Sequence, residues 1–290
     1  MNNTIDIDIS DLPASASPAI RSFVSTVREG YHTQRGTIKE WNKAAKIICG
    51  HSPLMHFLLS VAVGSLMRTA FKDMPGTILH IKGNSTTGKT TALQTLISLR
   101  ADPSDLTWCF DGVATLKWYT IAADNNFLCL DDIHVAIMPD NGVCRPIPHV
   151  YFKQFEDGSA THTTIISTSE LGLKQLAGAD YKAGLEINVD DYPIWPMYDH
   201  LSPWWMDTHI SDLKLNYGHV VYKVADSLSQ HYDAWVEFKH ELDEVIGCRS
   251  NPSKRALFLL YRLGQRWLLD YADIPNSSLE LSDSLMRKRT

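Results

Sequence analysis

The sequence predicts an α/β fold in which helices flank a five-stranded, mostly parallel sheet. The first observation is a set of five short apolar runs separated by helical or loop segments, as in a sheet covered on both faces. These runs are Thr77–Lys82, Leu106–Phe110, Phe127–Asp131, Thr163–Ser167 and Leu185–Val189. The second observation is that helical patterns precede and follow this block, which predicts N-terminal helices and a C-terminal helical lid.

Composition excludes several classes of protein. The chain has 290 residues, 44 % of them hydrophobic and 21 % charged, which excludes a disordered chain. Its net charge of −6 does not indicate a general polyanion binder. The chain has five cysteines, an odd number, with no CxxC pair. This pattern favours a reducing, cytoplasmic location, and it argues against a zinc ribbon. The longest apolar stretch, Phe57–Met67, is about half a membrane span, so we expect a buried helix and no membrane contact.

Helix signals divide the N-terminal region. We expect a flexible tail over residues 1–16 and a short helix from Ser17-Pro18 to Glu29. Thr37 and Glu40 form a capping box for a helix that ends at Gly50. Ser52-Pro53 caps a third helix, which extends to about Phe71. Residues 17–72 are thus predicted to be helices packed on a core that spans residues 73–215.

The C-terminal region is also predicted to be helical. We expect one long helix from His219 toward Val245 and another from Asn251-Pro252 to about Tyr271. Together they make the predicted lid, residues 216–275. The polar end of the chain, residues 276–290, is predicted to be a frayed tail.

A glycine-rich motif fits GxxxxGK(S/T) in full. Its glycines let backbone N–H groups surround phosphates at the start of the following helix. Lys89 would place a point charge on the β- and γ-phosphates, and the Thr90 hydroxyl would bind Mg²⁺. We therefore expect a P-loop NTPase that binds ATP and Mg²⁺ through Gly83, Asn84, Ser85, Thr86, Thr87, Gly88, Lys89, Thr90 and Thr91.

Two further strand ends supply candidate catalytic groups. The apolar run Phe127–Leu130 ends in Asp131, which would orient Mg²⁺, and Asp132, which would polarise the attacking water. Many such ATPases carry a glutamate in the place of Asp132. The run Thr163–Glu170 ends in small hydroxyl residues, and either Ser167 or Thr168 could lie beside the γ-phosphate. A strand that simply leaves through a Ser/Thr turn is the alternative for this last run.

Aromatic residues cluster in the segment DDYPIWPMYDHLSPWW, which contains Trp195, Trp204 and Trp205. Such a segment is too aromatic to be fully solvated. We expect it to be a loop that packs against the body of the protein rather than a nucleic-acid contact.

With these motifs, the chain resembles the domain of unknown function 927 family over about residues 36–272. The matching stretches, in order, are GTIKEWNKAAK, LHIKGNSTTGKTTAL, LTW, NNFLCLDDI, ISTSE, YKAGLEINVDDYP, NYGHV and KRALFLLYRLGQ. The resemblance implies a helicase-like, AAA+-type ATPase of phages, plasmids or chromosomal cassettes, with a helical lid. It also implies a ring with ATP between subunits, and a γ-phosphate contact from Arg255 or Lys254.

The chain departs from the family pattern at positions that bear on ATP hydrolysis and on DNA binding. Where the family carries a basic pair and a further arginine, this chain has Ala179, Asp180 and Asn188. The segment FKQFEDGSATHTT is short and acidic, and the only tight basic cluster is Arg287-Lys288-Arg289. We therefore expect slow hydrolysis and weak DNA binding by this chain alone.

Two functions follow from these observations. The first is a DNA-associated, helicase-like ATPase of a mobile element or phage, acting as a ring. The second is a degenerate nucleotide-binding regulatory or assembly subunit with little motor activity, in a phage-related or defence complex. A small-molecule kinase shares the phosphate loop but is disfavoured by the family stretches.

Overall fold

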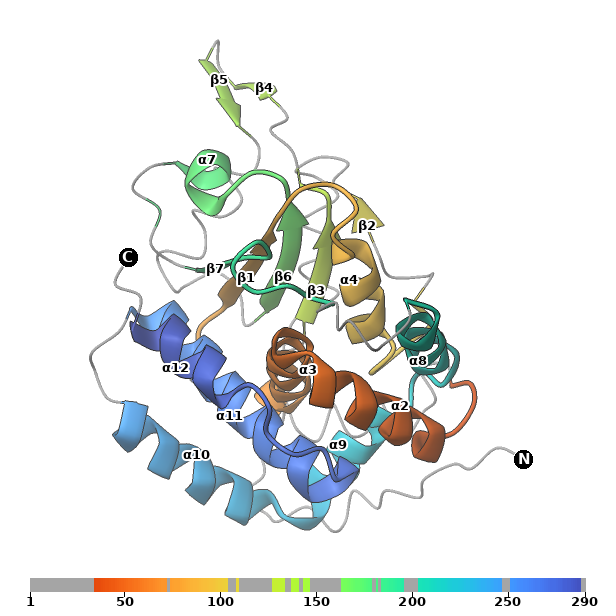
Figure 1. Cartoon of the computed structure of the whole chain (residues 1–290). Helices are drawn as coiled ribbons and strands as arrows, with labels where there is room; N and C mark the ends of the chain where they lie inside the picture. Colours follow the sequence, from red (N-terminus) through yellow and green to blue (C-terminus); the bar gives the residue numbers. More distant parts are fainter. Residues whose placement is uncertain are drawn as a thin grey trace.

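The computed structural model describes most of the chain from residue 34 onward (Figure 1). The described ranges are 34–71, 74–103, 108–109, 127–133, 137–140, 143–146, 163–178, 181, 184–195, 203–246 and 251–287. The expected tail and first helix, residues 1–16 and 17–29, lie outside these ranges, so those two predictions remain untested.

The main sheet has strand order β2-β3-β6-β1-β7, with every neighbouring pair parallel. Four strands have four to six residues: β1 (Thr77–Lys82), β3 (Phe127–Asp131), β6 (Thr164–Ser169) and β7 (Leu185–Asn188). Of the predicted strand Leu106–Phe110, the structure describes only Trp108 and Cys109, which form the edge strand β2 (Trp108–Cys109). The parallel α/β prediction is confirmed, but on four full strands rather than five. A separate antiparallel pair, β4 (Ile137–Asp140) and β5 (Val143–Pro146), was not predicted.

The predicted caps start the N-terminal helices. Helix α2 (Ile38–His51) begins after Thr37, whose hydroxyl accepts a hydrogen bond from the Glu40 amide. Helix α3 (Pro53–Leu66) begins after Ser52 in the same way and continues into a 3₁₀ turn, η2 (Met67–Ala70). Helix α4 (Lys89–Ile97) follows the glycine-rich loop, and the short helix α7 (Leu173–Ala177) follows β6.

Helices α3 and α11 (Pro252–Ala272) cross with their backbones in close contact. A Cβ atom added at Gly64 would lie 1.9 Å from the Leu260 carbonyl oxygen, and one added at Gly264 would lie 1.8 Å from that of Ser60. Both glycines are therefore required at this crossing. The helices predicted as a lid thus share one continuous hydrophobic core with the N-terminal helices.

The C-terminal region differs from its prediction in three places. The expected long helix is two helices, α9 (Val220–Gln230) and α10 (Tyr232–Ile246), because the His231 backbone leaves the helical region at φ −131°. The expected frayed end contains helix α12 (Leu279–Arg287), which buries Leu281 and Leu285 against the core. The last three residues of the expected aromatic loop, Pro203, Trp204 and Trp205, belong to helix α8 (Pro203–Leu215).

Candidate active site

The glycine-rich loop connects β1 to α4 at the carboxyl edge of the sheet. Thr86 and Gly88 have left-handed backbone angles, with φ of 68° and 82°. A Cβ atom at Gly88 would lie 2.2 Å from Trp195 Nε1, and one at Gly83 would lie 2.1 Å from Val189 Cγ2. The segment after β7 therefore packs directly against the loop, and only glycine fits at these two positions.

Lys89 is the first residue of α4 and is buried at the loop. Its ammonium group donates hydrogen bonds to the carbonyl oxygens of Gly83, at 2.8 Å, and Asn84, at 2.6 Å. These bonds fold the side chain back along the loop, and its positive charge stays beside the backbone amides at the N-terminus of α4. Gly83 and Asn84 thus hold Lys89 through their carbonyl oxygens, but they do not line the cleft described below.

The Asp131 carboxylate joins three elements. It accepts hydrogen bonds from the Thr90 hydroxyl of α4, at 2.7 Å, and from the Thr168 hydroxyl of β6, at 2.6 Å. The Thr168 oxygen in turn accepts a hydrogen bond from the Asp132 amide, at 3.0 Å. Asp131 is buried at the end of β3, whereas the adjacent Asp132 is exposed and has φ of 51°. The three predicted motifs therefore meet at one carboxylate.

A cleft of about 810 Å³ opens over this carboxylate. Ten of its lining residues were assigned a role from the sequence, namely Ser85, Thr86, Thr87, Gly88, Lys89, Thr90, Thr91, Asp131, Asp132 and Thr168. Sequence reasoning assigned no role to the other four, which are Ile133, Ser169, Glu170 and Leu171. All four follow closely after Asp131 or Thr168 in the sequence, and this position could have indicated that they line the same cleft.

A buried histidine distinguishes Thr168 from Ser167. The Leu171 carbonyl can only accept a hydrogen bond, so His80 Nε2, at 2.8 Å, is the donor to it. Burial lowers the pKa of His80 to about 4, so the ring is neutral and its Nδ1 accepts from the Ser167 hydroxyl at 2.9 Å. Ser167 is therefore held by His80, while Thr168 faces Asp131. The hydrogen bond from His80 to the Leu171 carbonyl also fixes the backbone next to Glu170.

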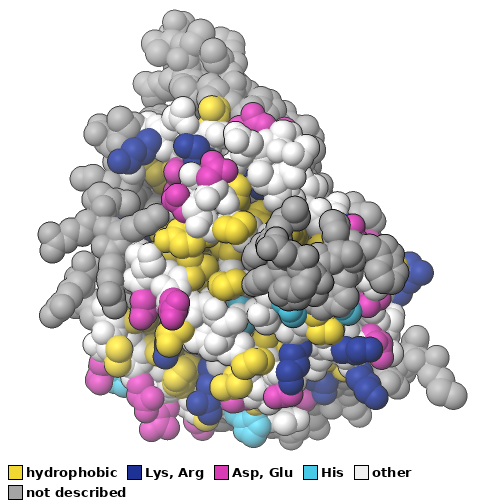
Figure 2. Space-filling view, viewed as in Figure 1, with side chains coloured by type: hydrophobic (Ala, Val, Ile, Leu, Met, Phe, Trp, Pro, Cys, Tyr) yellow, Lys and Arg dark blue, Asp and Glu magenta, His cyan; other side chains and the backbone are white. Residues whose placement is uncertain are grey.

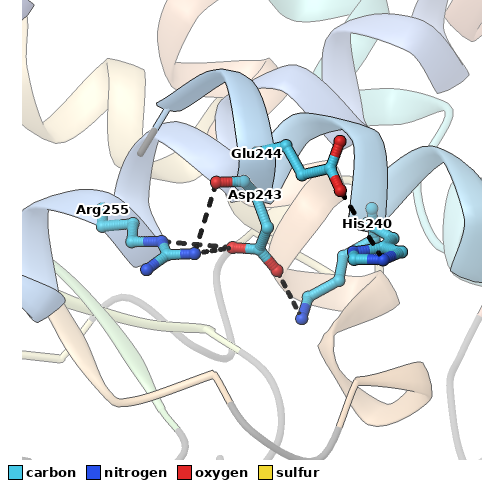
Figure 3. A network of polar contacts seen from close by, with 5 residues as sticks. His240, Asp243, Glu244 and Arg255 are labelled. Atoms are coloured by element: carbon cyan, nitrogen blue, oxygen red, sulfur yellow. Dashed lines mark hydrogen bonds and ion pairs between the residues drawn. The ribbon is translucent and has the colours of Figure 1, made fainter. Parts of the chain in front are cut away.

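Arg255, to which the resemblance gives a γ-phosphate contact, does not line the cleft of its own chain. Its guanidinium is 2.8 Å from Asp243 of α10, which also binds Lys239 at 2.6 Å (Figure 3). The carbonyl of Ser253, two residues earlier, accepts a hydrogen bond from Thr77, the first residue of β1. Arg255 therefore lies toward the amino edge of the sheet, opposite the glycine-rich loop, and does not line the cleft.

The Arg255 contact also affects its acidic partner. Burial of Asp243 opposes its charged form, but hydrogen bonds and charge from Lys239 and Arg255 outweigh burial and hold the pKa of Asp243 below its ordinary value. This ion pair connects α10 to the start of α11.

The positions where the family has arginines are only partly described. Asn188 is the last residue of β7, and its side chain accepts a hydrogen bond from the Asp190 amide. Ala179, Asp180, most of the acidic segment FKQFEDGSATHTT, and two residues of the basic cluster, Lys288 and Arg289, lie outside the described residues. Arg287 ends α12.

The residues at the cleft fit a magnesium ion only if a bound phosphate compound supplies further oxygen atoms to it. Asp131 and Thr90 provide two converging oxygen atoms, of the type that Mg²⁺ prefers. Within the described ranges, no three His, Cys, Asp or Glu side chains gather as a metal site. A Mg²⁺ ion at Asp131 would therefore complete its octahedral shell with phosphate and water oxygens.

Comparisons with known proteins agree with this fold. The family described as domain of unknown function (DUF927) matches residues 15–115, which confirms the resemblance over that stretch. Comparison with curated protein sequences gives no match. A solved structure described as "SCCmec type IV Cch - active helicase" superposes with a TM-score of 0.64 and 17 % identity over 87 % of this chain. The chain spans about half the length of that protein, since the match covers 50 % of it.

None of the described helices combines the length and the hydropathy needed to cross a membrane.

Proposed function

We propose that this chain is a P-loop NTPase of AAA+ type that binds Mg-ATP in the cleft over Asp131. The observation that carries the proposal is the convergence of Thr90, Asp131 and Thr168 from three elements beside the glycine-rich loop. Residues 83–91 would bind the phosphates, with Lys89 as the mobile cation. Asp131 and Thr90 would hold the metal ion, whose contribution is to neutralise charge on the phosphates.

Hydrolysis would depend on the groups that face the open side of the cleft. Asp132 is exposed there and would orient water and accept its proton. Thr168 would hold Asp131 in place through its hydroxyl and, at the same edge, lie beside the γ-phosphate. Glu170 adds a second carboxylate, for which no hydrogen bond or ion pair is found among the described residues.

The wider proposal is a helicase-like ATPase of a mobile element or phage, acting on DNA as a ring. It is supported by the family match and by the fold shared with a protein described as an active helicase. Arg255 at the opposite edge of the sheet supports a site that is completed by another subunit, because this chain brings no arginine from its described residues into the cleft. ATP binding and assembly would then promote each other.

The alternative is a nucleotide-dependent regulatory or assembly subunit with little turnover. It is favoured by Asp132 where many such ATPases have glutamate, and by Asn188 where the family has arginine. A missing trans arginine lowers turnover by about 10³–10⁵ where it has been measured, without abolishing binding.

Titration calorimetry with Mg-ATP and Mg-ADP tests the shared core of both proposals. Lys89→Ala should abolish or strongly weaken binding, whereas Lys174→Ala, an exposed lysine of α7 outside the cleft, should leave it unchanged. Failure of the folded wild-type protein to bind either nucleotide would refute the proposal. Single-turnover hydrolysis with and without DNA, with light scattering as a readout of assembly, then separates the ring ATPase from the regulatory subunit.

A further inference from the structure

Helix α2 and Arg35, three residues before its start, carry a row of basic side chains on one exposed face. Arg35, Lys39, Lys43 and Lys46 are all exposed and are spaced four, four and three residues apart. This spacing puts the three lysines on one side of the helix. Figure 2 shows Lys and Arg side chains grouped at the lower right, over the region where α2 lies in Figure 1.

The basic row is a fixed surface. The opposite face of α2 buries Trp41, Ala45 and Ile48, so the lysines can face only solvent. The segment before the helix is also held, because the Arg35 amide donates to the Tyr217 carbonyl at 3.1 Å, and the Thr37 amide to Asn216 at 2.9 Å.

The charges of the row are largely uncompensated. Lys46 forms an ion pair with Asp273 at 2.5 Å. No ion pair is found for Arg35, Lys39 or Lys43 among the described residues. Like charges four residues apart destabilise a helix, and here they occur on a protein whose net charge is −6. Helix α2 therefore carries more basic than acidic side chains, with Glu40 as its one acidic residue, on a protein whose net charge is negative.

The row is connected to the candidate active site through α4. The indole nitrogen of Trp41, on the buried face of α2, donates to the Ser98 hydroxyl at 3.2 Å. Ser98 caps the C-terminal end of α4, and its carbonyl also accepts from the Gly218 amide at 2.8 Å. Helix α4 begins at Lys89, so one rigid helix has the phosphate loop at one end and the base of the basic row at the other.

We propose that Arg35, Lys39 and Lys43 form a contact surface for the phosphodiester backbone of DNA. A rigid row of exposed cations matches a polymer with regularly spaced negative charges, and neutralising phosphates releases counterions. The surface contains no base-reading geometry, so binding is independent of sequence. This inference rests on the proposed function only for its choice of DNA as the polyanion, and it assigns the surface that the sequence did not reveal.

Fluorescence anisotropy with labelled single-stranded and duplex DNA across a salt series, without nucleotide, tests this surface. The double variant Lys39→Glu/Lys43→Glu should bind at least about tenfold more weakly and lower the salt slope by about 2. The matched control Lys223→Glu/Arg266→Glu makes the same change in net charge on α9 and α11, and it should bind as wild type does. Thermal unfolding checks that both variants fold.

Three outcomes would overturn the proposal. They are the absence of DNA binding by the wild type even at low salt, wild-type affinity in the α2 variant, and an equal loss of affinity in the control and the α2 variant. Mg-ATP calorimetry on the same samples keeps the two proposals apart. Normal ATP binding with no role for α2 refutes only the surface, whereas DNA binding through α2 without any ATP binding refutes only the NTPase.

Discussion

The Thr168 hydroxyl lies 2.6 Å from the Asp131 carboxylate and joins the carboxyl ends of β6 and β3. These two strands are neighbours in the sheet, with Leu130 paired to Ser167. The carboxylate also receives the Thr90 hydroxyl, so its two oxygens are held by different elements. Such a carboxylate is oriented before any metal ion arrives, which is what a positioned metal ligand requires.

Thr168→Val should therefore impair metal-dependent chemistry more than nucleotide binding. The change keeps the side-chain shape but removes the hydrogen bond to Asp131 and the acceptor for the Asp132 amide. Loss of an outer-shell partner typically costs about 10–100-fold in metal affinity or activity. We expect the Mg²⁺ concentration for half-maximal ATP hydrolysis to rise by that order, and Thr168→Ser to restore it. A Thr168→Val protein with wild-type Mg²⁺ dependence would contradict this role.

Asp132 and Glu170 give a comparison between two exposed carboxylates in one cleft. Asp132→Asn should lower single-turnover hydrolysis by about 10²–10⁴ while ATP affinity stays within a few fold, because a general base is removed but no phosphate ligand is. Glu170→Gln is the matched control and should retain the wild-type rate. The reverse pattern would assign water activation to Glu170, and equal losses in both variants would show that neither acts alone.

Much of this site could be predicted from the sequence because it depends on local chemistry. The glycine-rich loop, the Asp131 strand end and the Thr37 and Ser52 caps each involve residues close together in the chain. What could not be predicted depends on tertiary partners. Nothing local indicates that His80 would bind Ser167 and leave Thr168 for Asp131, or that Arg255 would pair with Asp243.

Of two other differences, one had a local signal in the sequence and the other did not. The β4–β5 pair is separated in the sequence by Asn141-Gly142, a dipeptide typical of tight hairpins. The end of the chain looked polar because its serines are numerous, but Ser278 and Ser282 are buried and hydrogen-bonded. One hydrogen-bond partner of Ser278 is His56, more than 200 residues earlier in the chain. No local pattern around Ser278 could therefore predict its burial.

The crossing of α3 and α11 predicts a large loss of stability in a one-methyl substitution. Gly264→Ala would place its Cβ atom 1.8 Å from the Ser60 carbonyl oxygen, so the two helices would have to separate. Overpacking of this kind costs about 1–3 kcal/mol, and each kcal/mol lowers Tm by about 2 °C in a protein of this size. Differential scanning calorimetry measures the shift.

Gly50→Ala is the matched control for this crossing. Gly50 is exposed in α2, and an added Cβ atom meets nothing within 4 Å. Alanine there should raise stability by about 0.5–1 kcal/mol, because glycine is a poor helix former. If Gly264→Ala shifts Tm upward as Gly50→Ala does, the close crossing of the two helices is wrong.

Two buried histidines predict a loss of stability in acid. Burial lowers the pKa of His56 and of His80 to about 4, below the value of about 6.5 expected in the unfolded chain. The unfolded chain therefore binds more protons, so their contribution to stability is present above about pH 6.5 and is lost as pH falls toward 4. Each histidine would contribute a few kcal/mol at neutral pH, on the order of 1.4 kcal/mol per pKa unit.

His56 of α3 contacts the residue that precedes α12. Its Nδ1 is 2.6 Å from the Ser278 hydroxyl, and that hydroxyl is 3.0 Å from the Tyr261 hydroxyl. Protonation of His56 should therefore weaken the docking of α12. Urea unfolding at a series of pH values should show the free energy of unfolding falling between pH 6.5 and 4. His56→Gln should reduce that dependence without abolishing it, because glutamine does not titrate while His80 still does. A wild-type free energy of unfolding that is constant over this interval would contradict the burial of both imidazoles.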